Sequence, residues 1–107
     1  ANGTVAYADI HAKDLAETGA LGEDTDGLIN YLRNIEGVRV AMIFRETRDA
    51  KTKVSFRTQA ELNAAEICRA FGGGGHAVAA GATIDAPIEE AREKVLAHLR
   101  NHSGLDV

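Results

Sequence analysis

The chain has 107 residues, 45% hydrophobic and 26% charged, which predicts a single folded domain with one core. It has no apolar run near the ~20 residues of a membrane-spanning helix and no signal peptide, and its one cysteine excludes a disulfide framework and a multi-cysteine zinc site. A net charge of −4, with two Tyr, three Phe and no Trp, argues against a domain that coats a duplex or stacks single-stranded bases.

The first part of the chain predicts a strand, a helix and a second strand. Residues 4–10 are rich in β-prone side chains. Residues 24–36 predict a helix that ends at Gly37, because apolar side chains recur with a period of 3.6 residues at Leu28, Ile29, Leu32 and Ile35. Residues 38–45 are apolar enough for an interior strand, and a turn over 47–50 follows.

The next strand is predicted over residues 51–57, where polar and apolar side chains alternate. One face enters the core and the other carries three cations and a hydroxyl. The inward residues are Thr52, Val54 and Phe56, and the outward residues are Lys51, Lys53, Ser55 and Arg57.

The remaining third predicts two helices and a short strand. Thr58 and Glu61 fit a capping box that starts a helix over 59–71, with Ala64, Ile67, Cys68 and Phe71 on its apolar face. Four glycines end this helix, residues 76–80 fit one short helical turn, and residues 81–85 fit a strand. Pro87 suits the first position of a last helix. The order β-α-β-β-α-loop-β-α predicts a single α+β domain with a mixed sheet.

Charge is spread unevenly along the chain. Residues 1–38 carry a net charge of −5 and residues 70–107 carry −2. Residues 39–69, with seven basic and four acidic side chains, carry +3. The middle third is therefore where an anionic group would be held.

The strongest local signal is the run from Gly72 to Gly75 followed by His76. Glycine loses more conformational entropy on folding than any other residue, so a folded domain keeps four only where the backbone adopts positive φ or approaches something closely. Glycine amides that lead into a helix N-terminus form an anion site, and the His76 imidazole could donate to phosphate. A flexible loop with an incidental histidine is the alternative. The run is neither a Walker P-loop nor a Rossmann fingerprint.

The second signal is Ser55 with Arg57. A spacing of two on a strand places the hydroxyl and the guanidinium on one face, and the guanidinium fork can grip phosphate bidentately. Lys51 and Lys53 extend that face. A solvated strand face is the alternative, but the helix after Arg57 would return the glycine loop to the same edge of the sheet.

Gly73-Gly74-Gly75-His76, followed by Ala79-Ala80-Gly81, resembles the GGGHxxAAG motif of the C-terminal domain of DHH phosphoesterases. The segment 54–58 resembles the strand before that motif, with Thr58 where the family often has Ser. The gap between Arg57 and the glycines, together with residues 23–28, resembles the branch that combines oligoribonuclease and phosphoadenosine-phosphate phosphatase activities. The resemblance extends from about residue 4 to residue 100.

The resemblance implies a substrate-binding domain of a cytoplasmic, metal-dependent hydrolase. It implies that Ser55 and Arg57 hold one phosphate, that Gly72 to Gly75 and His76 contact phosphate near the scissile bond, and that Lys53 and Thr58 are further candidates. In the family, manganese is held by a separate N-terminal domain that carries an Asp-His-His motif. No Asp-His-His occurs in these 107 residues, so we expect no catalytic residue, no metal ligand and no activity from this chain alone.

Other readings remain open. The chain could be a free-standing module for single-stranded nucleic acid, a RecJ-like exonuclease domain or a dimerisation domain. The parent's substrate could be a short RNA, a short DNA or a nucleoside bisphosphate. A chain that begins with Ala1 could be a processed product or an excised piece of a longer protein.

Four further polar groups are assigned ordinary roles. Asp24 and Asp26 suit the start of a helix better than a metal site. His98 and His102 have the spacing of a metal-ligand pair, but no third ligand is evident and solvent exposure is expected. Cys68 is expected in the core, and His11 has no evident partner.

Overall fold

The computed structural model describes residues 4–11, 22–47, 49–59 and 62–102. Within them the chain forms a mixed five-stranded sheet with helices on both faces, which confirms the predicted α+β class. None of the described helices has both the length and the apolar composition that crossing a membrane requires. The elements are β1 (Thr4–Ile10), α2 (Gly22–Arg33), β2 (Val38–Glu46), β3 (Thr52–Thr58), α3 (Ala64–Arg69), β4 (Gly74–His76), β5 (Ala79–Ile84) and α4 (Ile88–His102).

The strand order in the sheet is β1-β2-β3-β5-β4. β1 pairs with β2 in parallel, and α2 is the crossover between them. The pairs β2–β3, β3–β5 and β4–β5 are antiparallel. β4 therefore lies at one edge of the sheet, beside β5, and β1 lies at the other edge.

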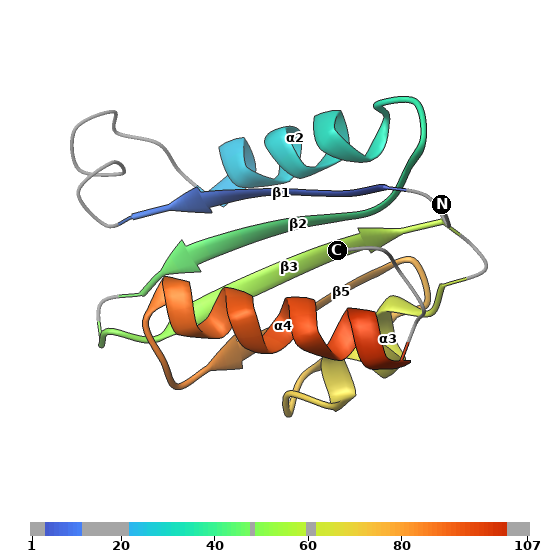
Figure 1. Cartoon of the computed structure of the whole chain (residues 1–107). Helices are drawn as coiled ribbons and strands as arrows, with labels where there is room; N and C mark the ends of the chain where they lie inside the picture. Colours follow the sequence, from blue (N-terminus) through green and yellow to red (C-terminus); the bar gives the residue numbers. More distant parts are fainter. Residues whose placement is uncertain (1–3, 12–21, 48, 60–61, 103–107) are drawn as a thin grey trace.

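Two apolar clusters cover the two faces of the sheet. On one face, alternate side chains of β2, β3 and β5 pack against α3 and α4, with Phe44, Phe56 and Leu99 fully buried. On the other face, Ile29 of α2 packs against Ala41 and Ile43 of β2. Figure 1 shows α2 on one side of the sheet and α4 on the other.

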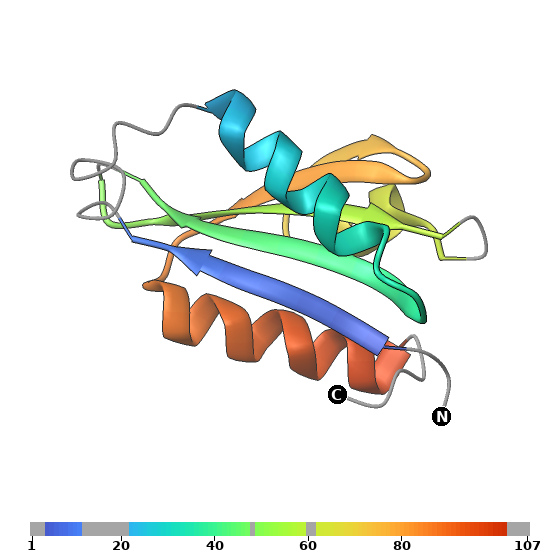
Figure 2. The same cartoon turned by 90° about the horizontal axis from the view of Figure 1, so that it is seen from above.

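The second face is only partly covered by a helix. α2 packs mainly against β2. Seen from above in Figure 2, the hairpin of β4 and β5 extends beside α2. The outward side chains of β3 and β5 therefore lie on a face that α2 does not fully cover, which is the face that carries the candidate site.

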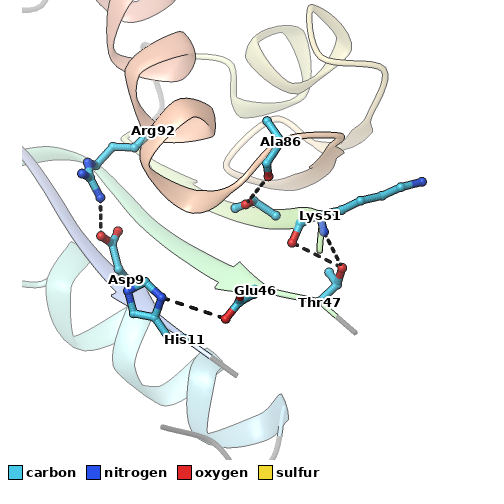
Figure 3. Close-up of polar contacts among 8 residues, drawn as sticks. Asp9, His11, Glu46, Thr47, Lys51, Ala86 and Arg92 are labelled. Atoms are coloured by element: carbon cyan, nitrogen blue, oxygen red, sulfur yellow. Dashed lines mark hydrogen bonds and ion pairs between the residues drawn. The ribbon is translucent and has the colours of Figure 1, made fainter. Parts of the chain in front are cut away.

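Polar contacts tie several of the elements together near one end of the sheet (Figure 3). Arg92 of α4 forms an ion pair with Asp9 of β1, 83 positions away in the chain. His11, for which the sequence shows no evident partner, lies with its Nδ1 atom 4.0 Å from Glu46 Oε1. The buried Thr52 hydroxyl donates to the Ala86 carbonyl at 2.8 Å. The ion pair between Asp9 and Arg92 thus joins the first strand to the last helix.

The predicted capping box at Thr58 is wrong. Thr58 is the last residue of β3 and is 3% exposed, and its hydroxyl donates to the Leu62 carbonyl at 2.5 Å. Asn63 caps α3 instead, because its side chain accepts a hydrogen bond from the Glu66 amide. Glu61 lies outside the described residues. Pairing with Val40 of β2 keeps Thr58 in the strand, and α3, which begins at Ala64, is correspondingly shorter than predicted.

The predicted helical turn after the glycines is also wrong. Residues 74–76 form β4, a turn follows at 77–78, and β5 begins at Ala79. The two strands pair in antiparallel register, Gly74 with Gly81 and His76 with Ala79. Small side chains suit this hairpin because its inner surface packs closely on α3, which contacts both strands.

The other predicted boundaries need small corrections. α2 covers residues 22–33, so Ile35 lies beyond the helix and is 44% exposed. The predicted stop at Gly37 is wrong, because the helix ends at Arg33; Gly37, with a φ of 87°, lies in the turn that leads into β2. α4 begins at Ile88, one residue after Pro87, whose carbonyl accepts a hydrogen bond from the Ala91 amide at 2.9 Å.

Candidate functional site

A cavity of about 660 Å³ lies over β3, β4 and β5. It brings together the two signals that the sequence carries separately, the outward face of β3 and the glycine loop. Its lining consists of Lys53, Ser55 and Arg57 of β3, the loop and strand 72–76, and residues 79–83 of β5. Every predicted site residue except Thr58 therefore lines one cavity.

The outward face of β3 forms one side of the cavity floor. Along β3 burial alternates, with Val54 and Phe56 fully buried in the core below. This pleat turns the side chains of Lys53, Ser55 and Arg57 to the opposite face. Arg57 is partly buried, and its Nη1 atom donates to the carbonyl of Phe56 at 2.9 Å, which holds the guanidinium close to its strand.

Three of the four consecutive glycines are required by the fold. Gly72 has a φ of 81°, in the left-handed region, where it follows α3. A Cβ on Gly73 would lie 2.2 Å from the carbonyl oxygen of Gly81. A Cβ on Gly75, which has a φ of 146°, would lie 2.7 Å from the Cα of Ala80. These positions exclude a side chain for reasons of backbone conformation and close packing alone.

Gly74 is different from its neighbours. A Cβ there would meet nothing within 4 Å, and its φ is not in the left-handed region. Gly74 lines the cavity and is paired with Gly81, which is itself paired with Ser55. The fold therefore does not require glycine at position 74, and a side chain at that position would occupy cavity space.

His76 is exposed and lines the cavity from the edge strand. It pairs with Ala79, and Ala79 pairs with Arg57 on its other side. Directly paired residues of antiparallel strands project to the same face, so the imidazole and the guanidinium flank a single methyl group. The glycines lead into a strand rather than a helix, so the predicted anion site at a helix N-terminus is not formed.

Thr58 is not among the residues that line the cavity. Its side chain lies on the other face of β3, where the hydroxyl bridges the carbonyls of Leu62 and Ala77. Its hydrogen bonds join the end of β3 to the segment before α3 and to the β4–β5 turn. Thr58 therefore stabilises the fold and does not face the cavity.

Thr83 lines the cavity and pairs with Lys53, although it was not among the predicted site residues. Alternation along residues 79–84 would have placed Thr83 on the same face as Ala79 and Gly81. Residues 81–85 were predicted to form a strand, but the sequence does not show that this strand pairs with β3 so that Thr83 lies beside Lys53. Only the observed strand pairing shows which of these residues face the cavity.

Two other polar groups lie away from the cavity. His98 is partly buried rather than exposed, with its ring 5.3 Å from that of Phe71 and 4.4 Å from that of His102. Burial, and next the neighbouring His102, lower the pKa of His98. Cys68 is buried in the core as predicted, and burial raises its pKa to about 11.

The described part of the chain holds no group of three or more His, Cys, Asp or Glu side chains placed to hold a metal ion. The residues of the cavity are instead donors suited to anions: a guanidinium, an ammonium, an imidazole and two hydroxyls. What this arrangement can do chemically is bind and orient phosphate groups.

The family model of the DHHA1 domain matches residues 2–102. The chain belongs to the DHHA1 domain family. It is 37% identical over 87 residues to the bifunctional oligoribonuclease and PAP phosphatase NrnA of Thermus thermophilus. That match covers 80% of this chain and 26% of the relative, so the chain spans about a quarter of the length of that curated protein.

Solved structures show the same fold as this DHHA1 domain. An exopolyphosphatase-related protein from Bacteroides fragilis superposes with a TM-score of 0.77 at 22% identity, over 89% of this chain and 29% of that one. The C-Ala domain of alanyl-tRNA synthetase from Aquifex aeolicus superposes with a TM-score of 0.60 at 21% identity, over 87% of this chain and 90% of that one. The fold thus occurs as part of a longer chain in the first structure and as nearly the whole chain in the second.

Proposed function

We propose that this DHHA1 domain binds the phosphate groups of short oligonucleotides or nucleoside bisphosphates on behalf of a hydrolase. The observation that carries the proposal is the meeting of Ser55, Arg57 and His76 around one cavity beside a glycine that the fold does not require. The relationship to NrnA supports this substrate class, since that relative is named as an oligoribonuclease and PAP phosphatase.

The role of each side chain in phosphate binding follows from the hydrogen-bond donors it carries. Arg57 supplies a planar fork that can hold two oxygens of one phosphate, and Ser55 adds a hydroxyl from the same strand face. His76 donates from the opposite side of the cavity. Gly74 leaves room for the ligand to approach the backbone of β4.

Hydrolysis itself is assigned to another part of a longer protein. We propose an N-terminal DHH domain that holds manganese and activates the attacking water, in keeping with the family resemblance and with the short span of the match to NrnA. The side chains of this domain bind and orient the phosphate under attack. A cytoplasmic location for this enzyme stays a prediction from the same resemblance.

The cavity offers little to a module that stacks bases. No Phe, Tyr or Trp is among its lining residues, whereas sequence-tolerant binding of single strands relies on aromatic platforms. A free-standing module would bind long strands with a steep salt dependence. The isolated chain should instead show only weak binding that does not grow with strand length beyond a few nucleotides.

The proposal is tested by titrating the purified chain with 5′-phosphorylated di- and trinucleotides and with adenosine 3′,5′-bisphosphate, following backbone amide shifts by NMR. We expect shifts confined to Lys53, Ser55, Arg57 and residues 72–83. Arg57→Ala should weaken binding by ~1.5–3 kcal/mol, the range for a hydrogen bond to a charged group. Gly74→Ala should weaken binding while leaving the spectrum of the free domain largely unchanged.

A matched control is Arg69→Ala, which removes an exposed arginine on α3 that lies outside the cavity. It should leave every ligand affinity unchanged. Shifts centred elsewhere on the domain, or equal losses in the Arg57 and Arg69 variants, would refute the assignment of the site.

A further inference from the structure

The floor of the cavity is organised in three rows that run across the strands. The first row is Lys53 with Thr83, the second is Ser55 with Gly81 and Gly74, and the third is Arg57 with Ala79 and His76. Members of a row are directly paired, so their side chains share one face of the sheet. All eight residues line the cavity.

Positive charge is placed only at the two ends of this floor. The third row holds the guanidinium of Arg57, and the first row holds the ammonium of Lys53. The middle row has nothing larger than the hydroxymethyl group of Ser55. Antiparallel strands advance by ~3.4 Å per residue, so the Cα atoms of Lys53 and Arg57 are ~14 Å apart along β3.

Lys53 stands in an unfavourable position for the fold. On its other side it is paired directly with Arg45 of β2. Like charges directly opposite each other destabilise a sheet. Within the part of the chain that the structure describes, neither of these two side chains makes an ion pair. Lys53 is exposed, so burial of its side chain does little to offset the repulsion.

An anion above the first row would relieve this repulsion. It would meet the ammonium of Lys53 and the exposed hydroxyl of Thr83, with Arg45 adding positive potential from the neighbouring strand. The separation of the two charged ends is close to the length of two sugar-phosphate repeats of an extended strand. A nucleoside bisphosphate, whose two phosphates lie on one ribose, is too short to reach both ends.

We propose that Lys53 and Thr83 form a second anion subsite, so that the domain recognises oligonucleotides whose phosphates lie two backbone repeats apart. This rests on the proposed function, because Arg57 and His76 hold the first phosphate. The two riboses and the middle phosphate between the two ends lie over Ser55, Gly81 and Gly74, where no side chain larger than a hydroxymethyl group stands in their way. Lys53 then determines preference for length rather than the presence of binding.

The test compares two ligands of the same base, the 5′-phosphorylated dinucleotide and the 5′-phosphorylated trinucleotide. Only the trinucleotide carries phosphates two repeats apart. Affinities are measured from NMR shifts for the wild-type chain, for Lys53→Ala and for Lys51→Ala, a neighbouring lysine that does not line the cavity. We expect Lys53→Ala to weaken binding of the trinucleotide about tenfold and binding of the dinucleotide less than twofold. Lys51→Ala should leave the affinity for both ligands unchanged.

Two further readouts separate binding from structure. For the trinucleotide, the slope of log affinity against log salt should fall by ~0.7 in Lys53→Ala, the value for one phosphate contact on a single strand. The thermal midpoint of the free domain should stay the same or rise, because the repulsion with Arg45 is removed. Lys53→Glu should raise the thermal midpoint further and should weaken trinucleotide binding more than Lys53→Ala does.

The outcomes distinguish this inference from the proposed function. Equal losses for both ligands, or no loss for either, would overturn the second subsite while the shifts at Ser55 and Arg57 still supported the first. Absence of shifts in the wild-type chain with every ligand would overturn both. A lower thermal midpoint in Lys53→Ala would show that the lysine is retained for the fold.

Discussion

Gly74 and Gly81 lie directly opposite each other in the pairing of β4 with β5, so two residues without side chains adjoin on the floor of the cavity. The two glycines differ in the space that a Cβ atom would have. A Cβ on Gly81 would lie 3.2 Å from the carbonyl oxygen of Val54, whereas a Cβ on Gly74 would lie in open space. The glycine run thus combines positions that serve the fold with one that serves the cavity.

This difference predicts opposite effects for two adjacent substitutions. Gly73→Ala should destabilise the domain by about 1–3 kcal/mol, since its Cβ would overlap the backbone of β5. Gly74→Ala should be neutral or stabilising by up to about 1 kcal/mol, because alanine restricts the unfolded chain. Urea unfolding of both variants measures the difference. Equal destabilisation would show that residue 74 is constrained by the fold as well.

Thr58 and Ser55 should separate stability from binding in the same way. Thr58→Val removes a buried hydroxyl that serves two carbonyls and should cost about 1–3 kcal/mol of the free energy of unfolding. Ser55→Ala changes a side chain at the cavity and should leave stability within about 0.5 kcal/mol while weakening phosphate binding. Denaturation curves and phosphate-ligand titrations of both variants check this. A binding defect in Thr58→Val under conditions where it is fully folded would assign Thr58 to the site.

Arg92 should contribute to stability from outside the site. It forms an ion pair with Asp9 and lies 5.9 Å from the ring centroid of Tyr7. The other carboxylate oxygen of Asp9, Oδ1, is buried and has no hydrogen-bond partner among the described residues. Arg92→Ala should cost about 1–2 kcal/mol, a value reduced because both side chains keep some contact with solvent. Lys94→Ala, which breaks the exposed pair with Glu90, should cost less than about 0.5 kcal/mol. Thermal unfolding that ranks the two variants in the reverse order would contradict this.

Cys68 should make the stability depend on pH in alkaline solution. Burial raises its pKa from 9.0 to about 11. A raised pKa means that the folded state holds its proton more tightly, so this contribution to stability is complete below pH 9 and is lost as the pH rises toward 11. The free energy of unfolding should therefore fall more steeply over that range in the wild-type chain than in Cys68→Ala. Parallel pH profiles for the two proteins would mean that the thiol titrates normally.

The thiol should also react slowly with iodoacetamide at pH 8, because the nucleophilic species is the thiolate. Alkylation should become fast only when the chain is unfolded in urea. A folded domain that reacts as fast as the unfolded chain would show that Cys68 is accessible.

Local sequence determined much of the architecture. The alternation from Lys53 to Arg57 was enough to assign the outward face of β3, because a pleated strand has a strict period of two. In the last helix, Ile88, Ala91, Val95 and Leu99 recur with a helical period, and they form the buried face of α4. The motif around His76 indicated the family and predicts an anion site. A run of glycines followed by a histidine is visible in the sequence itself, so this prediction needs no tertiary structure.

Only the tertiary structure decided what each glycine is for and which residues share a cavity. Thr58 carries a good helix-capping side chain, yet pairing with β2 and β5 kept the chain extended to the end of β3, and its hydroxyl satisfied buried carbonyls instead. The segment 74–76 became a strand because β5 offered unpaired backbone groups at the sheet edge. The pairing of Lys53 with Arg45 on one side and Thr83 on the other depends on strand register between distant segments. Register is set by how the whole sheet buries its apolar faces, and no local pattern encodes it.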